Sequence, residues 1–231
     1  MLRYITGVLL VACTLGSYAQ KTQFAAPDYK KISKSIEKKG ASTSYQTLME
    51  RYKAHDTTLS PKEYHLLYYG FPLQTEYNPS VSQPLADSLM LFMQKDQKTS
   101  IEYNGIIRLA HAILEKNPFE MRYLDPLIFA YRMQGKNELA TKLEFQLGRI
   151  AETIFSSGDG LTENTAFYVI SPTHAYDMLR ALGFGYKGGQ SIKKGACEFI
   201  KVESNDFGIE GMFFKTASPT TSRKSVHNCL Y

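Results

Sequence analysis

A helical spacing of apolar residues governs the chain from Pro27 to about Ser157 and stops near Gly160. This spacing places apolar side chains on one face of a helix, at positions i, i+3, i+4 and i+7. Beyond Gly160 the apolar residues come in short runs between glycine and other turn-forming residues. We therefore predict an α+β protein, in which residues 20–158 form an antiparallel helical layer and residues 159–217 form a small, mainly antiparallel β-sheet packed on it.

Two capping-box patterns mark helix starts within the first region. Ser60 with Glu63 forms the first pattern. Thr99 with Glu102 forms the second. In each, the Ser or Thr can cap a helix while the Glu three residues later reaches back to the cap. The apolar faces that follow consist of Tyr64, Leu67, Tyr68 and Phe71 in the first helix and Ile106, Leu109, Ala110 and Ile113 in the second.

The second of these helices should end at Asn117-Pro118, and a further repeating pattern follows it. The positions of that pattern are Leu127, Ala130, Tyr131, Gln134, Gly135 and Ala140. Their spacing resembles that of the tetratricopeptide helix-turn-helix, which implies a helical hairpin over about residues 101–157. Pro126 departs from the pattern, so the helix there either kinks or begins with Asp125 as its cap.

The region after Gly160 predicts short strands around one helix. Residues 166–170 form a compact apolar run that is typical of a strand. Ser171-Pro172 then combines a cap with a proline, which favours a helix start. Residues 196–203 and 209–216 predict two further strands joined by a turn. We expect the polar tail, residues 218–231, to be disordered.

The N-terminus predicts export from the cytoplasm. Arg3 precedes a short apolar run, and small residues at Ser17 and Ala19 suit a signal peptidase. We expect residues 1–19 to be a cleaved signal peptide and the mature protein to be periplasmic or secreted. The alternative is a lipid anchor on Cys13, which ends a lipobox-like run. No stretch is long and apolar enough to predict a transmembrane segment.

Charge and cysteine content exclude several classes of protein. Without Arg3 the chain has 26 Lys and Arg against 22 Asp and Glu, and these charges are dispersed, so no nucleic-acid partner is expected. The sequence contains no zinc or calcium motif, and we expect neither a metal nor a cofactor. Cys197 and Cys229 are suited to a disulfide in an exported protein, although spacing alone does not fix their geometry.

The joint between the two regions concentrates polar residues with catalytic potential. Asp159 could face a cation, or its loop could bind an anion, whereas Gly158 also suits a left-handed helix end followed by a turn. His174 and Asp177 lie three residues apart on one helix face and could form an acid–base pair near Ser171. Structural explanations compete here as well, because Ser171 can cap the helix and His174 can bond to local backbone.

A second candidate site is aromatic. Tyr64, Tyr68, Tyr69 and Tyr77 lie close together in the sequence and could stack on sugar rings or peptides. Helical spacing assigns Tyr64 and Tyr68 to the core. Tyr69 and Tyr77 therefore remain as the candidate binding residues.

A wider set of short blocks resembles a known family. The blocks are Pro27-Asp28-Tyr29, residues 48–52, 56–59 and 67–70, Asn117-Pro118-Phe119, and residues 156–160 and 176–179. Together they resemble a family of exported Gram-negative bacterial proteins catalogued as a domain of unknown function, number 4919. The resemblance implies an exported protein with a helical body and a small sheet, and it implies no activity.

Two functions remain as hypotheses. The first is a non-catalytic binding or scaffold module that recognises a protein, a peptide or another surface component, and it rests on the helical hairpin and the lack of a strong catalytic motif. The alternative is a hydrolase-like enzyme that uses His174, Asp177 and the Asp159 loop. An enzyme requires these side chains in one pocket, whereas a binding module requires an exposed apolar or aromatic surface.

Overall fold

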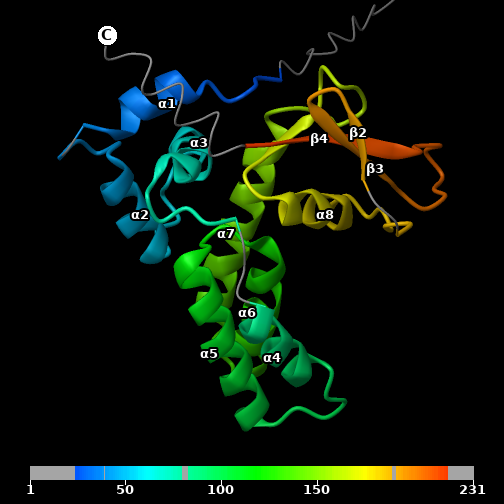
Figure 1. Cartoon of the computed structure of the whole chain (residues 1–231). Helices are drawn as coiled ribbons and strands as arrows, with labels where there is room; N and C mark the ends of the chain where they lie inside the picture. Colours follow the sequence, from blue (N-terminus) through cyan, green and yellow to red (C-terminus); the bar gives the residue numbers. More distant parts are fainter. Residues whose placement is uncertain (1–23, 39, 80–82, 189–190, 218–231) are drawn as a thin grey trace, which may run out of the picture.

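The computed structural model describes residues 24–38, 40–79, 83–188 and 191–217 (Figure 1). The predicted signal peptide, Cys13, Cys229 and the tail 218–231 lie outside these residues. The helices are α1 (Tyr29–Ile36), α2 (Tyr45–Lys53), α3 (Pro61–Gly70), the 3₁₀ helix η1 (Phe71–Leu73), α4 (Gln83–Met93), α5 (Ser100–Lys116), α6 (Met121–Met133), α7 (Asn137–Phe155) and α8 (Pro172–Ala181). The strands are β1 (Phe167–Val169), β2 (Ile192–Lys194), β3 (Cys197–Lys201) and β4 (Gly211–Thr216).

Helices α4 to α7 form a layer in which each helix packs against the next (Figure 1). The predicted hairpin corresponds to α6 and α7, where Ala130 and Ala140 are fully buried and Gly135 turns the chain with a φ of 74°. The capping box of Thr99 and Glu102 is formed at the start of α5. The sequence therefore predicted both the architecture and the signals that start and turn these helices.

Two features of this layer differ from the sequence expectation. Helix α6 begins at Met121 and runs through Pro126, so Asp125 does not cap it. Pro126 lies in the second turn, where it removes only the bond to the carbonyl of Arg122. Helix α4 was not predicted, and it packs so closely on α5 that a Cβ on Gly105 would lie 2.8 Å from the Phe92 ring.

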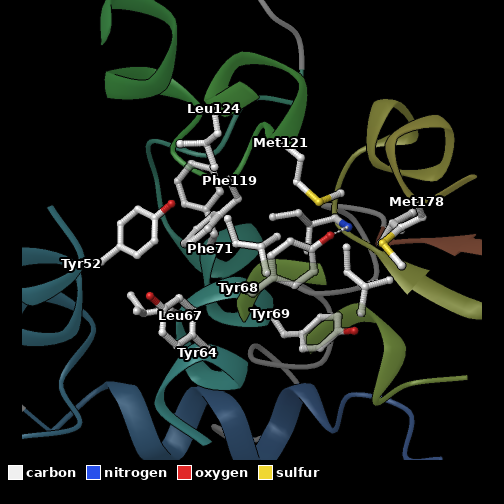
Figure 2. Packing of buried hydrophobic residues seen from close by; sticks show 14 of the residues in the cluster. Tyr52, Tyr64, Leu67, Tyr68, Tyr69, Phe71, Phe119, Met121, Leu124 and Met178 are labelled. Carbon is white, nitrogen blue, oxygen red and sulfur yellow. Dashed lines mark hydrogen bonds between the residues drawn. The ribbon is translucent and has the colours of Figure 1, made fainter. Parts of the chain in front are cut away.

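Helix α3 packs against α1, α2 and α7. Its buried residues extend around the helix and include Tyr64, Leu67, Tyr68 and Tyr69, all at 0% exposure. A helix that is covered on all sides buries more than one apolar face. Figure 2 shows how Tyr68, Tyr69 and Phe71 meet Phe119, Met121 and Met178 from other parts of the chain, so α3 joins the two regions in one continuous core.

The sheet is small and mixed, with the strand order β1-β4-β3-β2. Strands β2 and β3 are antiparallel, as are β3 and β4, and β1 is parallel to β4. A parallel pair requires a crossover, and α8 lies within the connection that leaves β1. The mainly antiparallel sheet is confirmed, while β2 falls in a glycine-rich segment for which no strand was predicted.

The joint between α7 and β1 corrects the predicted role of Gly158. Helix α7 ends at Phe155, and the left-handed residue is Gly160, with a φ of 71°, rather than Gly158. Gly158 is needed because of a close approach, since a Cβ there would lie 2.2 Å from the carbonyl oxygen of Thr165. That carbonyl also accepts hydrogen bonds from the N–H groups of Asp159 and Gly160, so these groups do not form an anion site.

We expect Gly158→Ala to lower the free energy of unfolding by about 1–3 kcal/mol, because the added methyl overlaps a backbone carbonyl that cannot move freely. Gly148→Ala is the matched control. Nothing lies within 4 Å of its added Cβ in the exposed face of α7, and we expect a gain of about 0.5–1 kcal/mol. Urea unfolding followed by circular dichroism measures both changes, and equal effects of the two substitutions would contradict the close-approach explanation.

Candidate functional site

Ser171, His174 and Asp177, the polar residues predicted as a possible acid–base site, lie at the cap of α8 and within that helix. Ser171 caps the helix by accepting a hydrogen bond from Thr173 N–H, as predicted. His174 and Asp177 are on the buried side of α8, at 1% and 5% exposure. Both side chains contact the beginning of α6 rather than solvent.

His174 lies between a tyrosine and a carboxylate. Its Nδ1 is 2.8 Å from the Tyr68 hydroxyl, which also accepts a hydrogen bond from Ile170 N–H at 3.3 Å. A phenol hydroxyl has one proton and two lone pairs, so it can bond to Ile170 N–H and to Nδ1 at the same time. The other ring nitrogen, Nε2, lies 3.5 Å from Oε1 of Glu120 and makes no hydrogen bond among the described residues.

Glu120 is a buried carboxylate, at 2% exposure, and it precedes the first residue of α6. Burial opposes its ionisation, but the neighbouring His174 ring, the Thr173 hydroxyl at 3.1 Å and the charge of Arg122 together lower its pKa. Its position at the N-terminus of α6 adds to this effect, since a helix dipole favours an anion there. The carboxylate therefore stays charged in the folded protein.

Asp177 supplies the cap that α6 otherwise lacks, because Glu120 makes no side-chain cap bond. Its carboxylate accepts from the backbone N–H of Arg122 at 3.3 Å and from Arg122 Nε at 3.2 Å. Arg122 in turn donates to the carbonyl of Thr173 at 2.8 Å. Burial raises the pKa of Asp177, and the adjacent Arg122 charge offsets part of that rise. The result is a bridge from the first turn of α6 to the first two turns of α8.

This arrangement does not assemble the predicted acid–base site. Within the part of the chain that the structure describes, no hydrogen bond joins His174 to Asp177, and each has its own partner. Asp159 lies in the α7–β1 loop, where its carboxylate accepts from Leu161 N–H. General acid–base catalysis requires a group that substrate can reach, and His174 is enclosed. The geometry does not favour the hydrolase-like alternative.

The tyrosine platform is also absent from the structure in the predicted form. Tyr69 is fully buried and donates to the carbonyl of Tyr168 at 3.1 Å. Tyr77 is partly buried and donates to the carbonyl of Ile170. Both tyrosines thus anchor the segment around β1 to the helical region.

Cys197 is a buried free thiol among the described residues, and its predicted partner Cys229 lies outside them.

A groove of about 940 Å³ remains at the surface where α4, α6 and α8 meet. Its lining includes Arg122 and Asp177, the ion pair that connects α6 and α8. Met90, Phe129 and Tyr186 line it as well, and these three are 50%, 40% and 40% exposed. We call this surface the α4–α6–α8 groove.

Ion pairs cross the polar side of the groove. Arg180 pairs with Asp125 at 2.8 Å and lies 4.0 Å from Asp177, while Arg122 pairs with Asp177. Arg180 and Asp125 are both largely exposed to solvent, so their ion pair contributes little to stability. In the Arg122–Asp177 pair, by contrast, the carboxylate is buried and therefore less screened by solvent. The groove therefore combines an apolar wall with fixed charges of both signs.

Sequence reasoning located Asp177 but missed the remaining groove residues. Arg122 and Asp177 are 55 positions apart, and no local spacing links them. The available signal was the set of exposed apolar residues on α4 and α6, since Met90 and Phe129 fall outside the buried faces of their helices. That signal becomes specific only when the helices are placed together.

Comparison with known proteins identifies a family but no individual protein that is similar to this chain. Residues 30–224 match the family described as Domain of unknown function (DUF4919). No curated protein and no solved structure matches the chain. Among the described residues no helix is long and apolar enough to cross a membrane, and no group of three or more His, Cys, Asp or Glu side chains could hold a metal ion.

We expect Tyr68→Phe to destabilise the protein by about 1–3 kcal/mol, because it leaves Ile170 N–H and His174 Nδ1 buried without their hydroxyl partner. Tyr64→Phe is the control from the same helix. The Tyr64 hydroxyl is buried with no hydrogen-bond partner among the described residues, so its removal should change the free energy of unfolding by less than about 0.5 kcal/mol or increase it. Urea titrations of both variants measure the difference, and a Tyr64→Phe loss as large as that of Tyr68→Phe would disprove it.

The buried carboxylates also predict a pH dependence with opposite signs. The folded pKa of Glu120 is lowered, so its ionised form stabilises the protein above its unfolded pKa of 4.5, and this contribution is lost as pH falls through the folded value. The pKa of Asp177 is raised from 3.8, so it opposes folding as pH rises through that range. Between about pH 6 and about pH 3, stability should fall less steeply in Glu120→Gln than in the wild type, and more steeply in Asp177→Asn.

Urea unfolding at a series of pH values, followed by circular dichroism, measures these slopes. The comparison uses the change with pH within each variant, so a constant loss of stability in either one does not affect it. A Glu120→Gln slope equal to or steeper than that of the wild type would contradict an ionised Glu120.

Proposed function

The chain belongs to this family of uncharacterised function, and we propose that it is a non-catalytic binding module whose α4–α6–α8 groove holds a peptide segment of a partner protein. The observation that carries this proposal is the exposure of large apolar side chains in the groove, next to fixed arginines. An exposed apolar surface rimmed by polar groups is typical of an interaction site.

The residue types favour a peptide over a small polar ligand. Aromatic residues, Met and Arg are enriched at protein–protein interfaces, and the groove has all three kinds. Tyr176 and Tyr186 stack edge to face with ring centroids 5.0 Å apart, while Met90 and Met93 lie along α4. Methionine side chains adapt to varied apolar partners, and tyrosines supply contact area at a low cost in conformational entropy.

The geometry of the groove also supports this function. Its polar side is pre-organised, because Arg122 is held by Asp177 and by the carbonyl of Thr173. A pre-ordered surface loses less entropy on binding. The exported location that residues 1–19 predict would place such a module among surface and periplasmic proteins, and this location is part of the proposal.

Phe129→Asp should remove peptide binding at this groove, since it introduces a charge into the apolar wall at a position 40% exposed on α6. Peptides selected from a random displayed library against the wild-type protein should bind Phe129→Asp at least about tenfold more weakly, as expected when a central aromatic contact is lost. Fluorescence anisotropy of the labelled peptides measures the dissociation constants.

Leu161→Asp is the matched control, because Leu161 is also exposed, at 51%, but lies in the loop between α7 and β1. It should leave peptide affinity unchanged. If the selected peptides bind Phe129→Asp as tightly as the wild type, the groove is not their site and the proposal fails.

A further inference from the structure

The sheet has an outward face that shares no residue with the α4–α6–α8 groove. On the opposite face, Ile200 and Phe214 are buried in the core. Because side chains alternate along a strand, the residues next to these point away from the core. We use the name outer sheet face for six of the outward residues, which are Tyr168 in β1, Ile192 and Lys194 in β2, Phe199 in β3, and Phe213 and Lys215 in β4.

The strand register arranges this face in two rows. Ile192 is opposite Phe199, and Phe199 is opposite Phe213, so the first row is apolar. Strands β2 and β4 are both antiparallel to β3, so Lys194 and Lys215, each two residues beyond the first row, lie on the same side of it. Two strand spacings separate the backbone positions of these lysines by about 10 Å.

Both lysines are held above aromatic rings. The Lys194 Nζ atom lies 4.5 Å from the centroid of the Phe199 ring and 5.4 Å from that of Phe213. The Lys215 Nζ atom lies 5.4 Å from the centroid of the Tyr168 ring. A ring attracts an ammonium group without neutralising it, and neither lysine pairs with a carboxylate of the described residues. The two positive charges are therefore available to an anion.

The charge of this face has one sign. Within the four strands, which the structure describes in full, no Asp or Glu occupies an outward position. Glu163, in the loop before β1, approaches the edge of the face, where its carboxylate would lie 3.5 Å from a Cβ on Gly195. The face therefore complements a negatively charged partner.

The undescribed residues that adjoin the sheet in sequence do not supply such a partner. Residues 189–190, before β2, are Gly and Gln. Residues 218–231, after β4, include Arg223 and Lys224 and contain no Asp or Glu. Like charges repel, so the charge of the tail does not favour the tail as the occupant of the outer sheet face.

The shape of the face favours a narrow polymer over an anionic membrane. The Phe199 ring lies against the backbone of β4, since a Cβ on Gly211 would be 2.6 Å from it, and so it does not protrude to insert among lipids. Phe207 is 80% exposed, but it lies in the turn after β3 together with Asp206 and Glu210. A membrane broad enough to contact this turn would bring its negative charge close to these acidic residues.

The position of the face favours a sugar polymer over an acidic peptide. Peptides join sheets at a free strand edge, where backbone N–H and C=O groups remain unpaired. The outward face presents side chains, and its charged donors are ammonium groups. A sugar ring can pack its apolar C–H groups on aromatic side chains while its carboxylate accepts hydrogen bonds from lysine.

We propose that the outer sheet face binds an acidic polysaccharide. Its carboxylates pair with Lys194 and Lys215, and the C–H groups of its sugar rings pack against the row that includes Phe199 and Phe213. This surface and its ligand are independent of the peptide proposed for the α4–α6–α8 groove.

Three probes of equal length separate the contribution of charge from that of the sugar. Hexagalacturonate has both, maltohexaose has the sugar without charge, and hexaglutamate has the charge without the sugar. Isothermal titration calorimetry with the full-length protein measures their affinities. Hexagalacturonate should bind saturably, and more weakly as salt is added, while the other two should bind at least about tenfold more weakly.

Variants place the binding on this face. Lys194→Gln and Lys215→Gln should each weaken hexagalacturonate binding about two- to fivefold, the effect of losing one exposed charge. Lys193→Gln is the matched control, because Lys193 is the neighbour of Lys194 in β2 but pairs with Glu198 on the other side of the sheet, and it should leave the affinity unchanged. Glu163→Gln removes a negative charge near the face and should strengthen binding.

Four results would overturn the proposal. They are a lack of saturable hexagalacturonate binding, equal affinity for hexaglutamate, which would indicate a general anion surface, and an equal loss of affinity in Lys193→Gln and Lys194→Gln. The fourth is binding to vesicles of phosphatidylcholine and phosphatidylglycerol that hexagalacturonate does not compete with and that Lys194→Gln weakens, since this would assign the face to a membrane. Phe129→Asp, in the groove, should leave hexagalacturonate affinity unchanged, so this test and that of the proposed peptide site can fail separately.

Discussion

Two buried carboxylates, one at the start of α6 and one within α8, hold the helical layer and the sheet together. Glu120 and Asp177 are 2% and 5% exposed, and removing a charge from water costs several kcal/mol unless partners replace the hydration. Here the partners come from the opposite helix in each case: Thr173 and His174 face Glu120, and Arg122 faces Asp177. Because neither charge can be satisfied without the other helix, the position of α8 on α6 is strongly specified.

This constraint extends through the rest of the fold. Helix α8 leaves β1, and β1 pairs with β4, so fixing α8 also fixes the sheet against the helical layer. Tyr68 extends the same network to α3, because its hydroxyl contacts both His174 and the backbone of Ile170 at the end of β1. His174 and Asp177, which resembled a catalytic pair, are therefore part of the attachment between the two regions.

Local signals in the sequence predicted much of the fold. The Thr99 capping box, the Gly135 turn and the Ser171 cap act within a few residues, and each is formed where it was expected. Effects that arise from packing were not predictable in this way. Periodicity assigns one buried face to α3 and so leaves Tyr69 outside, whereas neighbouring helices cover that side too. Gly158 suggested a left-handed helix end, but the close approach of the Thr165 carbonyl, in the loop before β1, explains this glycine.

The candidate sites show the same limit. The i, i+3 spacing placed His174 and Asp177 on one helix face. Their partners Glu120 and Arg122 lie more than 50 residues earlier in the sequence, and Arg122 and Asp177 are separated by 55 residues. A pair of residues that share a face need not share a partner. The Tyr45 hydroxyl, which is buried with no hydrogen-bond partner among the described residues, had no sequence signal at all, since its state depends on the packing around it.

One short segment forms part of the wall of the α4–α6–α8 groove and of a cavity bounded by α2 and the end of α5. Asn117 and Pro118 line the cavity, and Arg122 lines the groove. Between them, Phe119 and Glu120 are almost fully buried, and the Pro118 carbonyl accepts a hydrogen bond from Tyr52 at 2.8 Å. This segment is fixed by contacts on both sides, so the wall that it gives to each hollow is pre-organised. The buried Glu120 that faces α8 therefore also helps to fix the shape of the groove in which we propose that a peptide binds.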